Sequence, residues 1–513
     1  MNAEPRRRRS SRRTQADKPD LLPQLPARMV RNPYPPMELL SADQVEAIHD
    51  ASMRILEEFG IEVMNGRALD LFVRAGATVD RERQTVRLDR EMVSETIATT
   101  PASFDLTPRN PERVVRLGGD RINFTLVAGP PNVHDCERGR RAGNMGDYRD
   151  LVRLAQHFNC ITMLGNQVCA PMELPANNRH LDTYRANLVE TDKSFHVSAI
   201  GRDRALDGIR MMAIARGISL DEMAKSPGVT TIISVNSPRR FDGEMAEGLM
   251  TMAEHGQPVC VTPFTLMGAM SPVTLAGALA QQNAEALFGI VLAQLVRPGT
   301  PVIYGAFTSN VDMRSGAPAF GTPENARANI ASGQLARRYR LPYRTTPGSA
   351  SNAADAQGAW ETMMALWGAV LGHGNLIYHA AGWQEGGLTA SYEKFVMDVE
   401  MIQHVTEFLK PITVDEDELA LDALRRVPTG GHFFGDAHTL ERYSTAFYQP
   451  LLSNWQNYES WQEAGGLDAT RRATRVWKKA LEEYEQPALD EAIREELDAY
   501  VVKRKEEIGG GEP

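Results

Sequence analysis

The pattern of hydrophobic and polar positions changes character near residue 121. From there, short runs rich in β-branched and apolar residues alternate with longer runs whose apolar positions follow the helical period. Strands are predicted at residues 122–128, 161–169, 194–200, 230–236, 258–262, 301–306, 342–346 and 375–381. Helices are predicted at 147–158, 178–190, 203–217, 242–255, 274–296, 323–339, 355–371 and 391–409. Alternating units of this kind form parallel sheets with right-handed crossovers, and eight of them close an α/β (β/α)₈ TIM barrel.

A doubly wound open sheet is the alternative arrangement of the same units. That fold would carry a G-x-G-x-x-G turn after a strand and an acidic residue about 20 positions later. The sequence contains neither this combination nor a G-x-x-x-x-G-K-[ST] phosphate loop. The barrel is therefore the favoured prediction.

The segments on either side of the barrel are predicted to be additions to it. Ser41 looks like the N-cap of a helix that ends before Gly60, a second helix follows at 67–75, and alternation over 104–117 suggests a small sheet. After residue 410 the chain is helical and charged, with helices predicted at 414–424 and 469–487. We divide the chain into a disordered basic tail (1–36), an N-terminal accessory region (37–120), the barrel (121–410) and a C-terminal helical extension (411–513). The glycine-rich segment 430–435 either covers the barrel mouth or connects two helices.

Composition and charge narrow the class of protein. The chain has 513 residues and a formal net charge of −10, and the arginines between Arg6 and Arg13 conceal an even more acidic body. An acidic body argues against nucleic-acid binding. No stretch is apolar enough for a membrane span or for an export signal after the arginines. Four cysteines without a C-x-x-C pair do not form a disulfide scaffold. We therefore expect a cytoplasmic protein; the sequence leaves its oligomeric state open, a homo-oligomer included.

In a (β/α)₈ barrel the chemistry lies in the loops that follow the strands. Here these loops and strand ends are rich in aromatic residues, among them Tyr304, Phe307, Tyr378 and Trp383, and in carboxylates, Asp312, Asp355 and Glu385. Aromatic faces attract cations, and quaternary ammonium ions are frequent ligands of such cages. The sequence thus indicates a binding site for a quaternary amine, although each aromatic side chain could also belong to the packed core.

Other chemistries have weaker support. His134, His196, His379 and Cys169 lie near strand ends, but their spacing does not force the convergence of three or four ligands that zinc requires. A G-x-S-x-G elbow and a reactive-cysteine context are both missing. A metal-dependent lyase or hydrolase, and a non-catalytic protein that binds quaternary amines, remain alternatives.

Several long segments resemble one family. They are SPVTLAGALAQQNAEALFGIVLAQLVRPGTPVIYGAFTSNVDMRSGAPAFGTPE (271–324), DAQGAWE (355–361), HAAGWQEGGLTASYEKFVMD (379–398) and PTGGHFFGDAHTL (428–440). From about residue 40 to the C-terminus, the chain resembles the trimethylamine methyltransferase (MttB) superfamily. The resemblance implies a (β/α)₈ barrel that moves a methyl group from a methylated amine to the cobalt of a corrinoid protein. It also implies that this chain binds no cofactor tightly, because the partner carries the cobalamin.

One departure from the family pattern bears on the substrate. Archaeal trimethylamine enzymes of this family carry pyrrolysine near the seventh strand, whereas residues 345–353 here are the ordinary sequence TTPGSASNA. In this respect the chain is similar to the glycine betaine methyltransferases, which use quaternary amines. A quaternary ammonium already carries its charge and leaves as a neutral amine, so the protein need only bind the cation, orient one methyl group and exclude water.

The resemblance suggests roles for the candidate residues. Trp383, Tyr378, Tyr304 and Phe307 would form the cage. Glu385, Asp355 and Asp312 would stabilise the cation, and Arg314 or His379 would pair with a betaine carboxylate.

Overall fold

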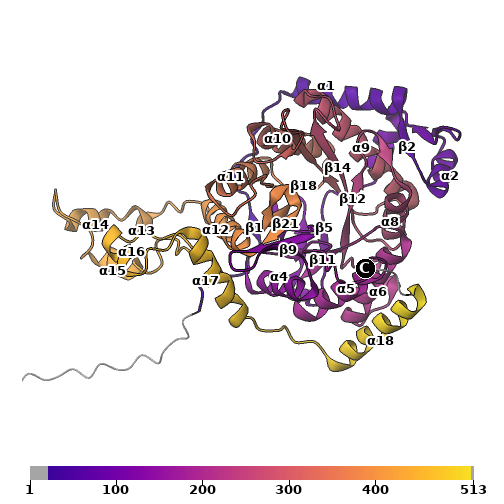
Figure 1. The fold of residues 1–513 in the computed structure, drawn as a ribbon. Helices are drawn as coiled ribbons and strands as arrows, with labels where there is room; N and C mark the ends of the chain where they lie inside the picture. Colours follow the sequence, from indigo (N-terminus) through magenta and orange to yellow (C-terminus); the bar gives the residue numbers. More distant parts are fainter. Residues whose placement is uncertain (1–20, 510–513) are drawn as a thin grey trace, which may run out of the picture.

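Eight parallel strands close a barrel in the structure, a computed structural model that describes residues 21–509 (Figure 1). The strands are β7 (Arg121–Leu126), β10 (Met163–Leu164), β11 (Ser194–Val197), β12 (Thr230–Val235), β14 (Val259–Met267), β15 (Val302–Gly305), β18 (Tyr343–Thr345) and β19 (Leu376–Ala381). Each pairs in parallel with the next, and β19 pairs with β7 to complete the ring. All eight strand predictions are confirmed, although β10 is shorter than its apolar run.

Helices connect these strands and surround the barrel (Figure 1). The principal ones are α4 (Met145–His157), α5 (Arg179–Glu190), α6 (Arg202–Arg216), α8 (Gly243–Glu254), α9 (Leu275–Val296), α10 (Pro323–Arg338), α11 (Ala356–Leu371) and α12 (Tyr392–Phe408). A short helix, α7 (Leu220–Met223), follows α6. The predicted helices agree with the observed ones to within two residues, because their apolar positions pack on the strands. The TIM-barrel prediction is thus confirmed.

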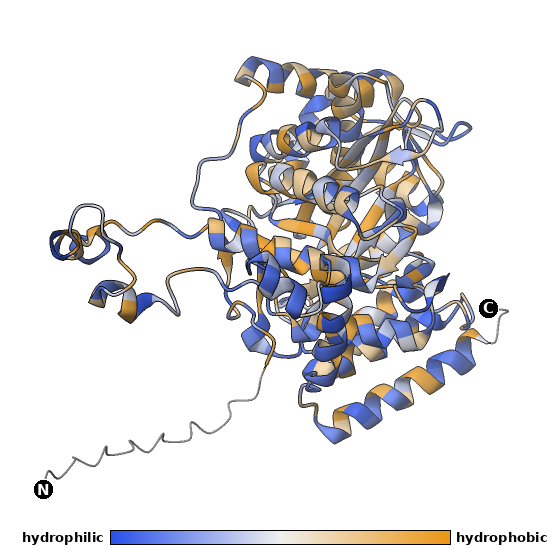
Figure 2. Cartoon of the chain, turned by 60° about the vertical axis from the view of Figure 1, so that its left-hand side comes forward, coloured by the Kyte–Doolittle hydropathy of each residue, from blue (hydrophilic) through white to orange (hydrophobic). Residues whose placement is uncertain are grey.

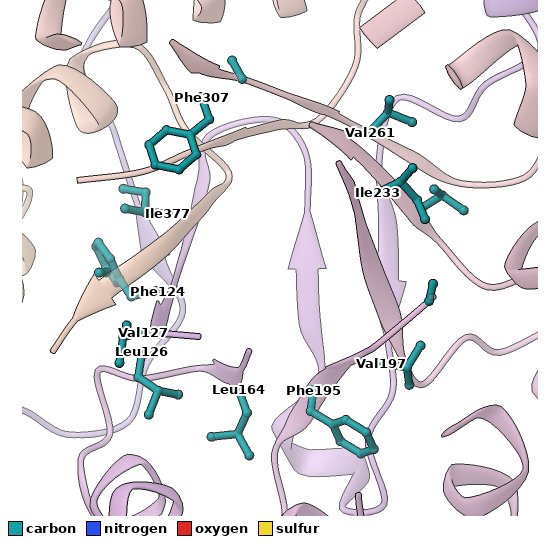
Figure 3. Packing of buried hydrophobic residues seen from close by; sticks show 14 of the residues in the cluster. Phe124, Leu126, Val127, Leu164, Phe195, Val197, Ile233, Val261, Phe307 and Ile377 are labelled. Carbon is teal, nitrogen blue, oxygen red and sulfur yellow. The ribbon is translucent and has the colours of Figure 1, made fainter. Parts of the chain in front are cut away.

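Strand residues alternate between the helices and the barrel interior. Figure 3 shows side chains of the larger core, among them Phe124, Leu126, Phe195, Val197 and Ile377. A smaller cluster combines four residues near the starts of barrel strands (Met163, Cys260, Ile303 and Leu376) with residues of a two-stranded antiparallel sheet (Leu106, Val115 and Leu117). That sheet is β5 (Phe104–Leu106) and β6 (Val115–Leu117). It packs at the amino ends of the barrel strands and confirms the small sheet expected at 104–117.

The N-terminal region also packs on the barrel. Its helices and strands are α1 (Ala42–Arg54), a π-helical turn (Ile55–Phe59), β2 (Ile61–Val63), α2 (Gly66–Ala75), β3 (Thr78–Asp80), β4 (Thr85–Arg87), α3 (Arg90–Ile97) and a 3₁₀ turn (Pro111–Arg113). Strands β2, β3 and β4 form a sheet with β13 (Arg240–Phe241). The predicted caps are confirmed: Ser41 forms a capping box with Gln44, and Gly60 follows the π-helical turn at φ +72°.

Part of the segment predicted as a disordered tail has a defined place. Arg6 to Arg13 lie outside the described residues. Residues 21–36, however, run along the barrel: β1 (Val30–Arg31) pairs antiparallel with β7, and the Asn32 amide donates to the Asp120 carbonyl at 2.8 Å. The pairing satisfies backbone groups that proline-rich composition alone would leave to water.

The C-terminal extension has two parts. A projecting arm, residues 411–468, carries the short helices α13 (Glu416–Leu419), α14 (Leu421–Arg426), α15 (Ala437–Arg442) and α16 (Tyr458–Glu463) (Figures 1 and 2). Beyond it, α17 (Ala469–Glu482) packs on α12 and α4, and α18 (Glu491–Ile508) packs on α5 and α6. None of the helices within residues 21–509 is both long and apolar enough to cross a membrane.

Two details of this extension differ from prediction. The helix expected at 414–424 is interrupted at Ala420, whose positive φ of +51° separates α13 from α14. Helix α18 was not predicted, because its sequence is highly charged. It is held by buried Leu497 and Val501 and by the ion pair of Arg504 with the buried Asp207 of α6, at 2.7 Å.

Candidate functional site

A cavity of about 540 Å³ opens at the carboxyl ends of the barrel strands. Its lining includes Ile232 and Ser234 of β12, Asn236 and Asp242 after that strand, Thr262 and Phe264 of β14, Phe307, Arg344 of β18, His379 of β19, and Trp383, Gly386 and Gly387. Short strands beyond the barrel surround this mouth: β8 (Asn132–Asp135), β9 (Gly139–Ala142), β16 (Phe307–Val311), β17 (Pro318–Ala319), β20 (Trp383–Gln384) and β21 (Thr389–Ser391). Its position agrees with the expectation that the strand ends carry the site.

Aromatic rings form one wall of the cavity. Trp383 lies with its ring centre 4.3 Å from that of His379 and 5.9 Å from that of Phe307, which in turn lies 4.8 Å from Phe264. The Trp383 indole donates to the Ser349 carbonyl at 3.0 Å, which fixes the ring. Gly387 has φ +96°, and a Cβ there would lie 2.5 Å from the indole, so only glycine allows this close approach. The arrangement offers aromatic faces to a cation.

Arg344 reaches the same cavity from β18. Its side chain is 1% exposed, and its guanidinium carbon lies 4.9 Å from the ring centre of Tyr378 and 5.4 Å from that of Phe307. Nη1 donates to the Ala306 carbonyl at a long 3.4 Å, and Nε has no partner. Within residues 21–509 no carboxylate forms an ion pair with it. Burial lowers the pKa of this guanidinium, yet arginine stays charged in proteins.

A buried charge without a counter-ion is costly to the fold. Its persistence at a cavity wall is typical of a site whose ligand supplies the opposite charge. Arg344 therefore indicates that the ligand carries an anionic group.

Two histidines near Arg344 are neutral. Burial, with the nearby positive charges, holds the pKa of His379 well below its ordinary value and lowers that of His196 to about 3. His379 has φ +61°, and its Nδ1 accepts from the Ala128 amide at 3.1 Å, which sets the ring's orientation. His196 makes no hydrogen bond through either ring nitrogen, and its ring forms a T-shaped pair with that of Tyr378, the ring centres 4.8 Å apart. The cavity floor therefore takes its positive charge from Arg344.

The structure brings the predicted cage residues together only in part. Trp383, Phe307 and His379 line the cavity, and Tyr378 lies beneath the guanidinium. Tyr304 does not reach it, since this residue lies on the outer face of β15, where its hydroxyl donates to Asn283 of α9 at 2.9 Å. The sequence could not fix which residues of each strand face inward.

The predicted carboxylates do not line the cavity. Asp355 caps α11 and accepts from the Gly358 amide at 3.0 Å. Asp312 closes its own exposed turn through Ser315, and Arg314 is exposed in the same turn. Glu385 lies beside the mouth: burial acts to raise its pKa, but hydrogen bonds from Arg140 and Thr389 leave that pKa below its ordinary value. These carboxylates are satisfied locally, which makes them poor partners for a buried cation.

Sequence reasoning did not single out Arg344, and it offered Arg314 or His379 as the partner of a betaine carboxylate. The signal was an arginine in the middle of the apolar segment PYRTT, since arginine is almost never fully buried without a partner. Asp242 was also missed; it lines the cavity while capping α8. The histidines do not converge on a metal: no cluster of three or more His, Cys, Asp or Glu side chains occurs in the described part of the chain.

The chain is similar to known proteins over most of its length. A family model described as trimethylamine methyltransferase (MTTB) matches residues 5–509, so the likeness begins well before residue 40 and includes the basic tail. A glycine betaine methyltransferase of Desulfitobacterium hafniense (strain Y51) is 38% identical over 93% of this chain and 98% of its own. A trimethylamine methyltransferase of D. hafniense (strain DSM 10664 / DCB-2) is 29% identical over 91% and 94%. A proline betaine:corrinoid methyltransferase of Eubacterium limosum is 27% identical over 90% and 96%.

Proposed function

Because the chain belongs to the trimethylamine methyltransferase family, we propose that it transfers a methyl group from a betaine to a corrinoid held by a separate protein. A betaine here is a zwitterion with a quaternary ammonium and a carboxylate. The names of two relatives support this, since one acts on glycine betaine and another on proline betaine with a corrinoid acceptor.

The observation that carries the proposal is the unpaired guanidinium of Arg344 beside an aromatic wall. The carboxylate of a betaine would pair with Arg344, and its ammonium would lie against Trp383 and Phe307. A simple cation such as a protonated amine would instead be repelled by the buried positive charge. The cavity thus favours a zwitterion over trimethylamine and over choline.

The chain's own residues need to do little chemistry. The corrinoid, brought by its carrier protein, supplies the Co(I) nucleophile. Arg344 and the aromatic wall would hold the substrate so that one methyl group points to the open mouth. The departing amine is neutral, so no proton needs to be delivered, which agrees with the neutral state of His379 and His196. The apolar wall would keep water from the reacting carbon.

The proposal is tested by anaerobic methylation of cob(I)alamin, followed by its absorbance. Glycine betaine, proline betaine, choline and trimethylamine are compared as donors. We expect turnover with a betaine and little with choline or trimethylamine. Arg344→Gln should raise the KM for the betaine on the order of 100-fold, because the ligand carboxylate would lose its buried partner. The matched control Arg314→Gln, in the exposed turn, should leave that KM unchanged.

Three results would contradict the proposal. One is turnover of trimethylamine or choline in preference to betaines. Another is an equal loss in the Arg314 and Arg344 variants. A third is tight betaine binding without methyl transfer, even when the corrinoid protein is supplied, which would identify a non-catalytic binding protein.

A further inference from the structure

A buried ion pair lies behind the aromatic wall of the cavity, and the methyl transfer does not need its charges. Lys394 and Asp398 are one turn apart on helix α12, and their side chains are 0% and 1% exposed. The Lys394 ammonium pairs with one carboxylate oxygen of Asp398 and donates to the Thr362 hydroxyl of α11 at 2.7 Å. Neither member of the pair lines the cavity. Any effect on the substrate must therefore pass through other residues.

The burial of this pair is costly to the fold. Two charges taken out of water lose hydration that their mutual attraction repays only in part, so apolar residues of similar volume often serve a fold equally well. In agreement, burial raises the pKa of the Asp398 carboxyl above its ordinary value, although Lys394 and the Gly382 amide act to lower it. A carboxylate that is kept at such a cost indicates a task other than stability.

The second carboxylate oxygen of Asp398 shows what that task is. It accepts a hydrogen bond from the Gly382 amide at 2.9 Å. Gly382 directly precedes Trp383 and has a φ of +89°. Its carbonyl accepts from the amide of Ser391, the N-cap of α12, at 3.0 Å. Both polar backbone groups of the glycine are therefore held by α12 and its cap, which sets the direction in which the chain enters Trp383.

Residues 379–387, which we call the mouth turn, need such support from outside. The pairing of β19 with β7 is irregular between Ile377 and Ala381. Beyond that point, positive φ angles occur at His379, Gly382, Glu385, Gly386 and Gly387. Two of these residues are not glycine, and other residues rarely adopt this conformation. Backbone of this kind persists only where the surrounding structure enforces it.

The mouth turn is held from two sides. On one side, the Trp383 indole donates to the Ser349 carbonyl at 3.0 Å, and the Glu385 amide donates to the Ser351 carbonyl at 2.8 Å. On the other side, Asp398 holds the Gly382 amide. The indole is thus fixed both at its ring nitrogen and at the backbone beside it. With the second contact removed, the ring could turn about the first.

We propose that Asp398 is a positioning residue: supported by Lys394, its carboxylate fixes the Gly382 amide and thereby holds the face of the Trp383 indole toward the substrate ammonium. The part played by the ammonium rests on the proposed function, whereas the placement of the ring does not depend on which ligand binds. A measurement on the ligand-free protein therefore tests the placement separately.

Another buried carboxylate, Asp207 of α6, provides the matched control. It accepts from His180 of α5 at 2.9 Å and from Tyr500 and Arg504 of α18 at 2.6 Å and 2.7 Å. These partners are side chains of helices that surround the barrel. Asp398, in contrast, uses one oxygen for a backbone amide of the mouth turn. A change at Asp207 should therefore affect stability alone.

Two paired substitutions separate the hydrogen bond from the charge. Lys394→Met with Asp398→Asn keeps an oxygen that can accept from the Gly382 amide, and we call it the acceptor variant. Lys394→Met with Asp398→Leu removes that oxygen, and we call it the acceptor-free variant. Both replace the ion pair with uncharged side chains of similar volume, which a fold often tolerates. Urea unfolding establishes that both variants are folded.

The first test follows the Trp383 ring without any ligand. The six tryptophans are labelled with 5-fluorotryptophan, and the fluorine resonance of Trp383 is identified by its loss in Trp383→Leu. This resonance should keep its position and width in the acceptor variant, and it should shift or broaden in the acceptor-free variant. Asp207→Asn should lower the urea midpoint and leave the resonance unchanged. An unchanged resonance in the acceptor-free variant, or equal changes in the two paired variants, would overturn the proposal whatever the substrate is.

The second test measures the affinity for a betaine with and without the indole. With Trp383 present, the acceptor-free variant should bind the betaine about tenfold more weakly than the acceptor variant. In the Trp383→Leu background the two should differ by less than about twofold, because the hydrogen bond then has no ring to position. An equal difference in both backgrounds would show a general structural effect and overturn the proposal. A wild type that binds no betaine would contradict the proposed function, while the fluorine resonance still decides whether Asp398 positions the ring.

Discussion

The two ends of the barrel use the same strands for opposite purposes. At the amino ends, the inward residues Met163, Cys260, Ile303 and Leu376 form a dry cluster sealed by β5 and β6. At the carboxyl ends, the inward positions include His196, Thr262, Arg344 and Tyr378, and a cavity opens above them. The closed end contributes stability, while the open end keeps a buried charge that costs stability. The contrast indicates that the charge is retained for a ligand.

The largest effects are expected for Arg344→Met, which should change stability and activity in opposite directions. Removing an uncompensated buried charge should make the ligand-free protein more stable, by about 1–4 kcal/mol. The same change should lower kcat/KM for a betaine on the order of 100-fold or more, because the ligand carboxylate loses its partner. Urea unfolding and anaerobic methyl-transfer assays measure the two effects. A loss of both stability and activity would place Arg344 in the structural framework and break the contrast.

A substitution at the closed end should lower stability and leave substrate binding unchanged. Leu376→Ala removes buried apolar volume from the dry cluster and should cost about 2–4 kcal/mol of unfolding free energy. The KM for the donor should stay within twofold of the wild type at a temperature where the variant is folded. Leu388→Ala, in an exposed loop, is the matched control and should change stability by less than about 0.5 kcal/mol. A selective rise in the KM of the Leu376 variant would contradict the separation.

A smaller effect is expected at the aromatic wall. Trp383→Leu keeps an apolar side chain but removes the ring face, so it should weaken binding of a betaine by about 1–2 kcal/mol, or roughly tenfold. Titration calorimetry measures this. A carboxylate ligand that lacks the ammonium group should bind both proteins equally. Equal betaine affinities in the wild type and the variant would show that the Trp383 indole does not bind the ammonium.

The smallest effect is expected for the neutral histidine His196. Its pKa is about 3 in the folded protein and near 6.5 when unfolded. Between these values the unfolded state binds more protons, so the stability contributed by His196 is present above pH 6.5 and is lost as the pH falls. His196→Phe should therefore lose less stability than the wild type between pH 6.5 and 5.5, by about 1 kcal/mol at most. The free energy of unfolding is measured with urea across that pH range. An equal change with pH in both proteins would show that His196 does not contribute to the pH dependence of stability.

The fold was predictable in detail, and the site only in part. The runs 230–236 and 274–296 predict a strand and a helix, because the spacing of their apolar positions matches the faces that pack on adjacent strands and helices. The sequence did not show which residues of each strand face the barrel interior. Tyr304 and Tyr378 both lie within apolar strands, yet they face opposite sides of the barrel wall. A one-residue difference in register decides which residue enters the cavity.

The carboxylates illustrate a second limit. Asp312 and Asp355 occur at the expected loops, yet each is used by its own turn or helix cap. Short acidic side chains satisfy nearby backbone amides more readily than distant ligands. Arg344 carried the more useful signal, since an arginine inside a predicted barrel strand has no local use for its charge.

The central claim is that Arg344 binds the carboxylate of the substrate. The most direct test is the coupling between that residue and that group. Two ligands are compared: glycine betaine, and the analogue in which an uncharged amide group replaces the carboxylate while the quaternary ammonium is kept. Binding of both is measured for the wild type and for Arg344→Gln. The wild type should prefer the betaine on the order of 100-fold, and the variant should lose that preference. A variant that still prefers the carboxylate by the same factor would contradict the claim.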